Sequence, residues 1–239
     1  MQADLSAALA DDLDQLIRLH DRELDAEILI ALQDAKFPDG LALLPQGAVG
    51  EAACTNMAAA LREPPLLDEL AADFAAIYLN NCFGASPYES VWLSDDHLAC
   101  AEPMFELRAL YAAAGLQVAD WRNRFDDHFV LQLHYLRHRL AMATVDPENL
   151  ANFIDEHIGY WFPEFARRVA LQCDTAFYAA LAELTHVWLI RCRQLLAELY
   201  DLPVPSRQTI AARINKKMVR DKAEVAPLRF MPGADGPSW

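Results

Sequence analysis

Three side chains of one predicted helix, Asp127, His134 and His138, are of the types that bind divalent cations in proteins. The segment 126–143 repeats apolar residues at helical spacing, and at about 100° per residue these three side chains fall on the same face. A helical metal-dependent hydrolase that uses them as ligands is therefore one interpretation. The helix lacks the Glu that follows the first His in metallopeptidase helices, so a solvated face of His and Arg is the alternative.

The same helix opens with three consecutive polar residues, Asp126, Asp127 and His128. An Asp at the start of a helix accepts hydrogen bonds from free backbone N–H groups and lies at the positive end of the helix dipole. Asp126 or Asp127 is therefore predicted to cap this helix. A binding surface formed by the same residues is the other interpretation, and the spacing alone leaves both open.

Two separate apolar stripes run along this helix and predict that it lies inside a bundle rather than at its edge. One stripe contains Phe129, Leu133, Leu136 and Leu140, and the other contains Leu131, Tyr135 and Met142.

An aromatic loop precedes this region, between two helical patterns. Phe83, Tyr88 and Trp92 lie within ten residues of one another and are interrupted by Pro87 and Ser90. Aromatic side chains on a loop either anchor it to the core or line a groove. A groove with aromatic walls and an acidic rim would suit an apolar peptide that carries basic residues at one end.

Helical periodicity also accounts for the rest of the chain, and no alternating strand pattern occurs. These patterns predict an all-α protein: a single helical-bundle domain of roughly nine or ten helices over residues 1–205, followed by a basic C-terminal tail over residues 206–239. Asp146 is expected to cap one of the helices and Pro163 to open another. The expected helices cover residues 5–19, 24–32, 47–62, 66–80, 102–114, 126–143, 147 onward, 163–173 and 175–200.

The formal net charge of −15 is unevenly distributed. Residues 206–239 contain seven Lys and Arg against three Asp and Glu, a net charge of +4, which leaves −19 for residues 1–205. Such an acidic body repels nucleic acid and anionic lipid and attracts basic peptides. Within the tail, residues 208–221 space Ile210, Ile214 and Met218 four apart among basic residues, which predicts a short amphipathic helix. Residues 227–239, rich in Pro and Gly, are expected to be loose.

The sequence also indicates a compartment. It has no apolar run of the roughly 18 to 20 residues that span a bilayer, and its first residues lack a secretory signal, so a cytoplasmic protein is expected. Five dispersed cysteines without a Cys-x-x-Cys pair predict reduced, mostly buried thiols and no structural zinc site. No cofactor is predicted, and nucleotide binding is not predicted because no phosphate-binding glycine loop occurs.

In their order and spacing, these motifs resemble those of the TorD/DmsD family of cytoplasmic chaperones, which mature molybdenum oxidoreductases. The resemblance covers most of the chain, from residue 26 to residue 200. Each motif is short, and specificity comes from finding five of them in the same order. The matching segments are residues 78–84, the loop Ser86-Pro87-Tyr88-Glu89-Ser90-Val91-Trp92-Leu93, residues 102–115, the pair Asp127-His128, and residues 161–165 with Phe177-Tyr178.

The resemblance implies an all-helical, non-enzymatic protein that binds the twin-arginine signal peptide, and often the body, of a molybdopterin oxidoreductase subunit. Such a chaperone holds its client in the cytoplasm until the cofactor is inserted, and only then is export allowed. The resemblance leaves the particular oxidoreductase open. Long helices joined by Pro-containing hinges are compatible with either a monomer or a domain-swapped dimer. The client-binding residues that it implies are Phe83, Pro87, Tyr88, Ser90, Trp92, Asp126, Asp127 and His128.

The chain also departs from the family pattern. Where the family has Glu-Pro before its Asp-His pair, this chain has Arg124 and Phe125, a change that would weaken arginine binding or retune it for one client. Where the family often has Trp, this chain has Tyr88, which keeps an aromatic wall. The basic tail after Pro205 lies outside the shared pattern. It is either a solvated extension or a segment that folds back on the acidic body and competes with the client peptide.

Overall fold

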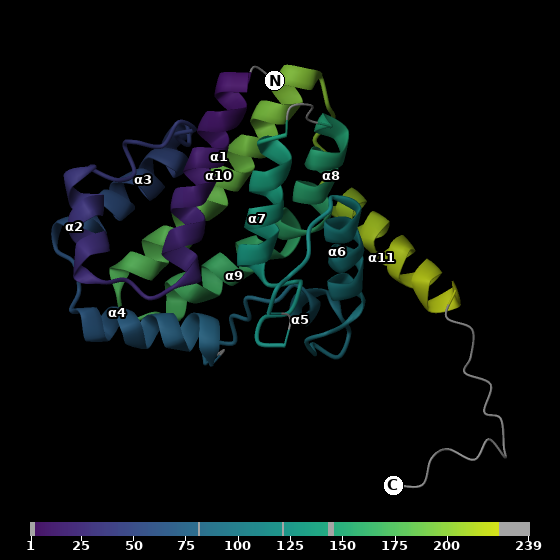
Figure 1. Cartoon of the computed structure of the whole chain (residues 1–239), viewed down its shortest axis with the longest axis horizontal. Helices are drawn as coiled ribbons and strands as arrows, with labels where there is room; N and C mark the ends of the chain where they lie inside the picture. The colour runs from purple at the N-terminus through teal and green to yellow at the C-terminus, as the bar shows by residue number, and fades with distance from the viewer. Residues whose placement is uncertain (1–2, 81, 121, 143–145, 225–239) are drawn as a thin grey trace, which may run out of the picture.

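The computed structural model describes residues 3–80, 82–120, 122–142 and 146–224. Within these residues every regular element is helical, and the β contacts consist of one isolated antiparallel bridge between Tyr88 and His128. In chain order (Figure 1) the elements are α1 (Ala3–Asp21), α2 (Ala26–Asp34), α3 (Gly47–Arg62), α4 (Leu67–Phe74), the π-helical turn η1 (Ala75–Leu79), α5 (Ser90–Leu93), α6 (Glu102–Ala113), α7 (Phe129–Leu140), α8 (Pro147–Glu156), α9 (Ile158–Gln172), α10 (Ala176–Tyr200) and α11 (Arg207–Glu224).

The all-α prediction is confirmed. Of the eleven α-helices in the described part of the chain, nine remain when the one-turn α5 and the tail helix α11 are set aside, which agrees with the expected nine or ten. No helix among the described residues combines the length and the apolarity needed to cross a membrane.

Helix α10 is the central element, and it packs against α3, α4, α8 and α9. Three consecutive residues are buried at 180–182 and again at 187–189, so other elements cover the helix on several sides. Thr175 precedes its first turn, and Asp201, in the left-handed conformation with φ of 51°, ends it.

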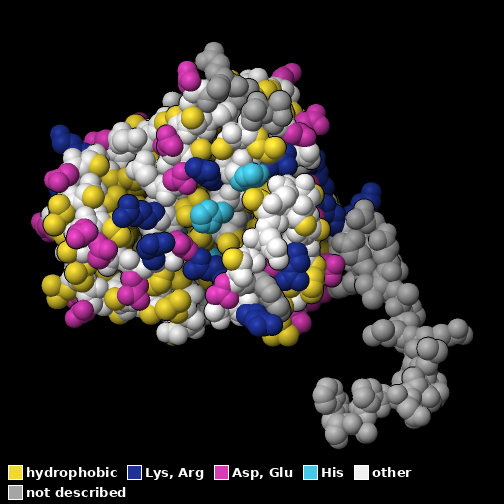
Figure 2. Space-filling model, in the orientation of Figure 1, with side chains coloured by type: hydrophobic (Ala, Val, Ile, Leu, Met, Phe, Trp, Pro, Cys, Tyr) yellow, Lys and Arg dark blue, Asp and Glu magenta, His cyan; other side chains and the backbone are white. Residues whose placement is uncertain are grey.

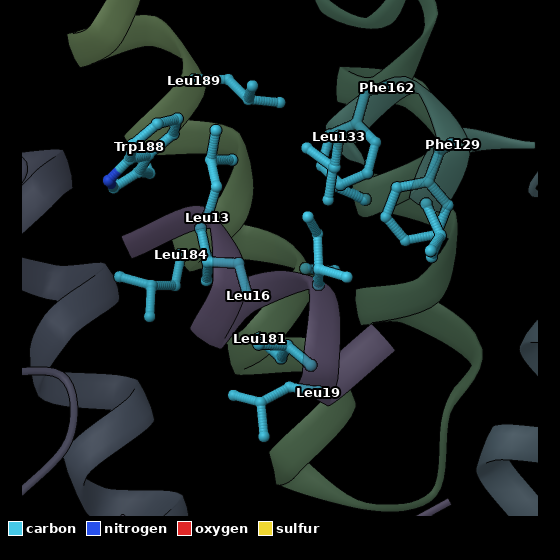
Figure 3. Close-up of a cluster of buried hydrophobic side chains, with 14 of the residues drawn as sticks. Leu13, Leu16, Leu19, Phe129, Leu133, Phe162, Leu181, Leu184, Trp188 and Leu189 are labelled. Atoms are coloured by element: carbon cyan, nitrogen blue, oxygen red, sulfur yellow. The ribbon is translucent and has the colours of Figure 1, made fainter. Parts of the chain in front are cut away.

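Helices α1 and α7 lie side by side in front of α10 (Figure 1). The close-up of the core shows apolar side chains of both helices meeting those of α9 and α10 (Figure 3). Polar contacts join α1 to α10 as well, because the Asp12 carboxylate accepts a hydrogen bond from Nε1–H of Trp188 at 2.9 Å. The apolar side chains labelled in Figure 3 are Leu13, Leu16, Leu19, Phe129, Leu133, Phe162, Leu181, Leu184, Trp188 and Leu189.

Of the two stripes expected on α7, one is fully buried and the other is only partly so. Phe129 and the three leucines that share its stripe have no exposed surface. In the second stripe Tyr135 is buried and Leu131 half-buried, whereas Met142 is 41% exposed. The expectation for Met142 was wrong because α7 ends at Leu140, before the helical face that would have carried Met142 inward.

Pro163 does not open a helix, contrary to the expectation. It lies inside α9, which begins at Ile158 directly after a break at His157. Gly159 makes this close succession of α8 and α9 possible, since a Cβ there would lie 2.4 Å from the carbonyl oxygen of Ile154. The expectation for Asp146 was correct: its carboxylate accepts the backbone N–H of Asn149 at 3.1 Å and caps α8.

The cysteines form no disulfide, but the prediction that most are buried was wrong. Cys192 is buried, Cys54 and Cys173 are half-buried, and Cys82 and Cys100 are exposed. The two exposed thiols lie in the loops on either side of α5, where the sequence pattern gave no information on burial. Residues 227–239, which were expected to be loose, lie outside the residues that the structure describes.

Candidate functional site

The aromatic loop is joined to the start of α7 by backbone hydrogen bonds. Tyr88 and His128 face each other in the antiparallel bridge. On either side of this pair, Glu89 N–H donates to the Asp127 carbonyl at 3.2 Å and Phe129 N–H donates to the Pro87 carbonyl at 2.9 Å. The two polar islands of the sequence are therefore parts of one structure.

Asp127 connects the two islands through its side chain. The side chain has no exposed surface, and Oδ2 accepts the backbone N–H of Ser90 at 2.9 Å. Its other oxygen, Oδ1, has no hydrogen-bond partner among the described residues. Burial raises the pKa of Asp127, and the hydrogen bonds from Ser90 only partly oppose this effect. Asp127 thus fixes the first turn of α5 onto the start of α7.

His128, and not Asp126 or Asp127, caps α7. Its Nδ1 accepts the backbone N–H of Val130 at 3.2 Å, so the expectation of an Asp cap was wrong. Burial lowers the pKa of His128 well below its ordinary value, and Arg124 and His20 act in the same direction. The ring is therefore neutral at physiological pH, and because Nδ1 accepts a hydrogen bond, Nε2 carries the proton.

Asp126 belongs to the same connection and is also buried. Its Oδ2 accepts two hydrogen bonds from Arg108, at 2.7 Å from Nη2 and 3.2 Å from Nε. Its carbonyl accepts the hydroxyl of Tyr111 at 3.1 Å. These contacts attach the start of α7 to α6, which follows the aromatic loop.

A cavity of about 640 Å³ lies beside this connection, and its walls are mostly apolar and aromatic. Of the eight residues expected at the site, the cavity brings two together in its wall, Tyr88 and His128. The rings of Tyr88 and His128 meet edge to face at a centroid distance of 5.1 Å. The complete lining is Asp21, Phe74, Tyr78, Leu79, Tyr88, Tyr111, Leu116, Gln117, Val118, Ala119, Asp120, Asn123, Arg124, His128, Leu131, His134 and Tyr135.

Charged side chains of both signs surround this apolar cavity. Arg124, the residue that replaces the expected Glu, forms an ion pair with Asp21 at the end of α1. Asp120 is exposed and accepts a hydrogen bond from the Asn123 amide at 2.7 Å. On the face of the molecule seen in Figure 2, acidic, basic and histidine side chains are likewise interspersed with hydrophobic ones.

The remaining expected site residues lie outside the cavity lining. Pro87 and Ser90 are buried in the connection described above, and Phe83 is half-buried against the core. Trp92 stacks on Trp161 at a centroid distance of 6.1 Å, and its Nε1–H donates to the Ser86 carbonyl at 2.8 Å. In the described structure, Trp92 therefore anchors the aromatic loop to α9.

The structure does not assemble the metal site considered from the sequence. Asp127 is enclosed and its carboxylate is bound to Ser90, whereas His134 is exposed on the cavity side of α7. Asp127 precedes the first turn of α7, so its side chain does not follow the helical face that carries His134 and His138. Among the described residues, no three His, Cys, Asp or Glu side chains form a group that could hold a metal ion.

Several residues of the cavity were not singled out in the sequence. The end of α1 contributes Asp21, and residues 116–120, 123 and 124 contribute further parts of the lining. Asp21 and Arg124 are about a hundred residues apart in the sequence, and neither helical periodicity nor motif spacing relates them. Arg124 alone carried a signal, as a departure from the family pattern.

The chain has clear similarity to known proteins. A family model described as "Nitrate reductase delta subunit" matches residues 46–167. The chain is 32% identical over 144 residues to a protein named "Chaperone protein TorD" from Vibrio cholerae serotype O1, an alignment that covers 56% of this chain and 64% of that protein. A protein of the same name from Shewanella oneidensis is 33% identical over 145 residues, with 58% of this chain and 65% of that protein covered.

These two alignments thus span just under two thirds of the relatives' own length. A longer alignment exists with the "Chaperone protein TorD" of Shewanella sp. strain MR-4. It is 30% identical over 193 residues and covers 77% of this chain and 91% of that protein.

Proposed function

Because the chain belongs to the TorD/DmsD family of maturation chaperones, whose members are not enzymes, we propose that it is a chaperone for a molybdopterin oxidoreductase subunit. In this proposal the protein binds the twin-arginine signal peptide of that subunit, its body, or both, in the cytoplasm. It holds the client until the cofactor is inserted, and the client is exported afterwards.

The observation that carries the proposal is the cavity of about 640 Å³ with Tyr88 and His128 in its wall. Binding sites for organic ligands are commonly of roughly 300 to 1,000 Å³, mostly apolar, with a few placed polar groups. The apolar segment of a signal peptide would lie against the aromatic wall. The neutral His128 ring would donate from Nε2 to a peptide carbonyl, since its Nδ1 is already used in capping α7.

Acidic groups at the rim support binding of basic residues next to that apolar segment. The exposed Asp120 carboxylate can accept a bidentate hydrogen bond from an arginine of the client. Asp21 is already paired with Arg124, so a client arginine has to compete with Arg124 for that carboxylate. Arg124 would thereby reduce the affinity for weakly basic peptides and favour a client with two arginines.

In this proposal the buried polar residues position the site without contacting the client. Asp127 holds Ser90, and Asp126 holds Arg108, so that Tyr88 stands opposite His128. Binding should therefore respond to changes at Asp127 through displacement of the aromatic loop.

Titration of the purified protein with a synthetic twin-arginine signal peptide from a neighbouring molybdoenzyme tests the proposal, with a Lys-Lys peptide as the control. We expect salt-sensitive binding that weakens with the Lys-Lys peptide. The Tyr88→Ala variant should bind about tenfold more weakly, a difference of about 1.4 kcal/mol. Phe105→Ala removes an exposed aromatic ring from α6, outside the cavity lining, and should leave the affinity unchanged.

If Tyr88→Ala and Phe105→Ala lost equal affinity for the signal peptide, this result would contradict the placement of the peptide in the cavity. Absence of binding by the wild-type protein to the signal peptide, together with capture of the folded client body, would restrict the function to the body alone.

A further inference from the structure

The basic tail helix α11 contacts the body along one side of its length. It packs against α8, then runs past α6 and away from the rest of the molecule (Figure 1). Ile214 is buried, whereas its neighbours Arg213 and Lys216 are exposed. Ile210 and Met218 are half-buried on the same helix, and charged side chains add ion pairs to this apolar contact.

Lys217 makes the closest of these contacts. Its ammonium group lies 2.7 Å from Glu106 of α6 and 2.6 Å from Glu156 of α8. Arg213, one turn earlier, lies 3.5 Å from the Glu156 carboxylate and 3.4 Å from Oδ1 of Asn152. Two basic side chains of α11 thus neutralise carboxylates of the body.

A buried pair extends this acidic surface inward. The Glu89 carboxylate, 1% exposed, is bound through Oε1 to Nδ1 of His157 at 2.9 Å, and Nε2 of His157 lies 4.0 Å from Glu106. Burial opposes the charging of His157, but Glu89 and Glu106 outweigh it and raise the His157 pKa. Glu89 lines the narrow cleft beneath Lys217, and its Oε2 has no hydrogen-bond partner among the described residues.

The carboxylates also border a groove of about 430 Å³ between α6 and α8, with Lys217 as part of its lining. We call it the α6–α8 groove; its lining is Glu106, Leu110, Ala113, Tyr135, Arg139, Asn149, Asn152, Phe153, Glu156, His157 and Lys217. Tyr135 also lines the cavity described above, so the groove and the cavity are neighbours.

We propose that the α6–α8 groove is a second docking surface, for a basic segment of the client protein, and that α11 is the chain's own occupant, which the client displaces. Without Lys217 and Arg213, Glu106 and Glu156 lose their basic partners on α11, and a segment with two basic side chains would pair with these two carboxylates again. The contacts of α11 are sufficient to support the groove as a docking surface and α11 as its occupant. The identity of the displacing segment rests on the proposed function.

The test uses the full chain and a fluorescent peptide with the sequence of residues 207–224. Lys217→Glu places a negative charge between Glu106 and Glu156 and should release α11, leaving the groove open to the peptide. Lys216→Glu changes the net charge equally at an exposed neighbouring position and is the matched control. We expect Lys217→Glu to bind the peptide at least tenfold more tightly than the wild type or Lys216→Glu.

A second variant locates the binding. In the Lys217→Glu background, Glu156→Gln should weaken binding of the 207–224 peptide at least tenfold. Circular dichroism should show that the fold is unchanged. Equal dissociation constants for the wild type, Lys217→Glu and Lys216→Glu would overturn the inference, as would insensitivity to Glu156→Gln.

The same variants separate this inference from the proposed function. A twin-arginine signal peptide should bind Lys217→Glu more tightly than the wild type. If the 207–224 peptide discriminates as expected but the signal peptide binds none of the proteins, recognition of the signal peptide and its role as the displacing segment both fail, whereas α11 as the occupant of the groove stands. If the signal peptide binds all variants equally while the 207–224 peptide fails to discriminate, only the inference about the groove is overturned.

Discussion

The carboxylate of Asp127 accepts the backbone N–H of Ser90 at 2.9 Å, which joins the start of α7 to a loop 37 residues earlier in the chain. The two residues are both fully buried. Their contact places Tyr88 opposite His128 in the cavity wall, so a residue without access to a ligand determines the shape of the surface that we propose as the binding site.

Asp127→Ala should therefore lower stability as well as binding. The substitution leaves the Ser90 N–H buried without a partner, and we expect the free energy of unfolding to fall by about 1 to 3 kcal/mol. Asp127→Asn keeps an oxygen acceptor and should lower the free energy of unfolding by a smaller amount. Urea unfolding and the hydrogen-exchange rate of the Ser90 amide measure the two effects. Loss of peptide binding with unchanged stability and exchange would instead indicate that Asp127 contacts the client directly.

Trp92→Phe should affect stability but not client binding. The substitution keeps an aromatic ring against Trp161 and removes the hydrogen bond from Nε1 to the Ser86 carbonyl. We expect a loss of about 1 kcal/mol in the free energy of unfolding and signal-peptide affinity equal to that of the wild type. A large loss of affinity at wild-type stability would place Trp92 in the binding surface.

The stability of the protein should depend on pH through His20. This side chain is buried, with Nδ1 2.6 Å from the Tyr78 hydroxyl and Nε2 2.9 Å from Oγ1 of Thr185, and burial lowers its pKa to about 3. Below about pH 6.5 the unfolded chain takes up a proton here that the folded protein does not. The stabilisation is therefore complete above that pH and is lost towards about pH 3, by up to about 1.4 kcal/mol per pH unit.

The variant His20→Gln tests this dependence, because Gln can hydrogen-bond but does not titrate in this range. Urea unfolding at a series of pH values between about 6 and 4 should show a shallower slope in the variant than in the wild type. An identical slope in both proteins would mean that His20 is already protonated in the folded state.

Breaking the ion pair between Arg193 and Asp155 should be strongly destabilising. The guanidinium of Arg193 on α10 donates from Nε and Nη2 to the two oxygens of Asp155 on α8, each at 2.9 Å, and both side chains are only 7% exposed. Removing one partner of a buried pair leaves an uncompensated charge and costs about 3 to 5 kcal/mol. Asp155→Leu should show this loss in urea unfolding.

Replacing both partners gives the control for this pair. The double variant Asp155→Leu/Arg193→Met leaves no buried charge at the site and should recover most of the stability. Equal stability of the single and double variants would mean that the cost arises from packing rather than from the unpaired guanidinium.

The sequence by itself determined the helical elements and the order of the motifs. Gly47–Arg62 was predicted with its observed ends, and the stripe from Phe129 to Leu140 is buried as expected, because the pitch of a helix repeats apolar positions locally. The ends of helices were less predictable. His128 caps α7 because Asp127 is already bound to Ser90, a distant residue.

Only the tertiary structure decided which residues meet at the site. The cavity joins the end of α1, η1, the aromatic loop and the start of α7, and Asp21 and Arg124, which pair with each other, both line it. Similarly, Lys217 of the tail reaches Glu106, 111 residues earlier. Such contacts depend on how the helices pack around α10, and no local periodicity encodes them, since spacing along a helix fixes a face but not the partner that covers it.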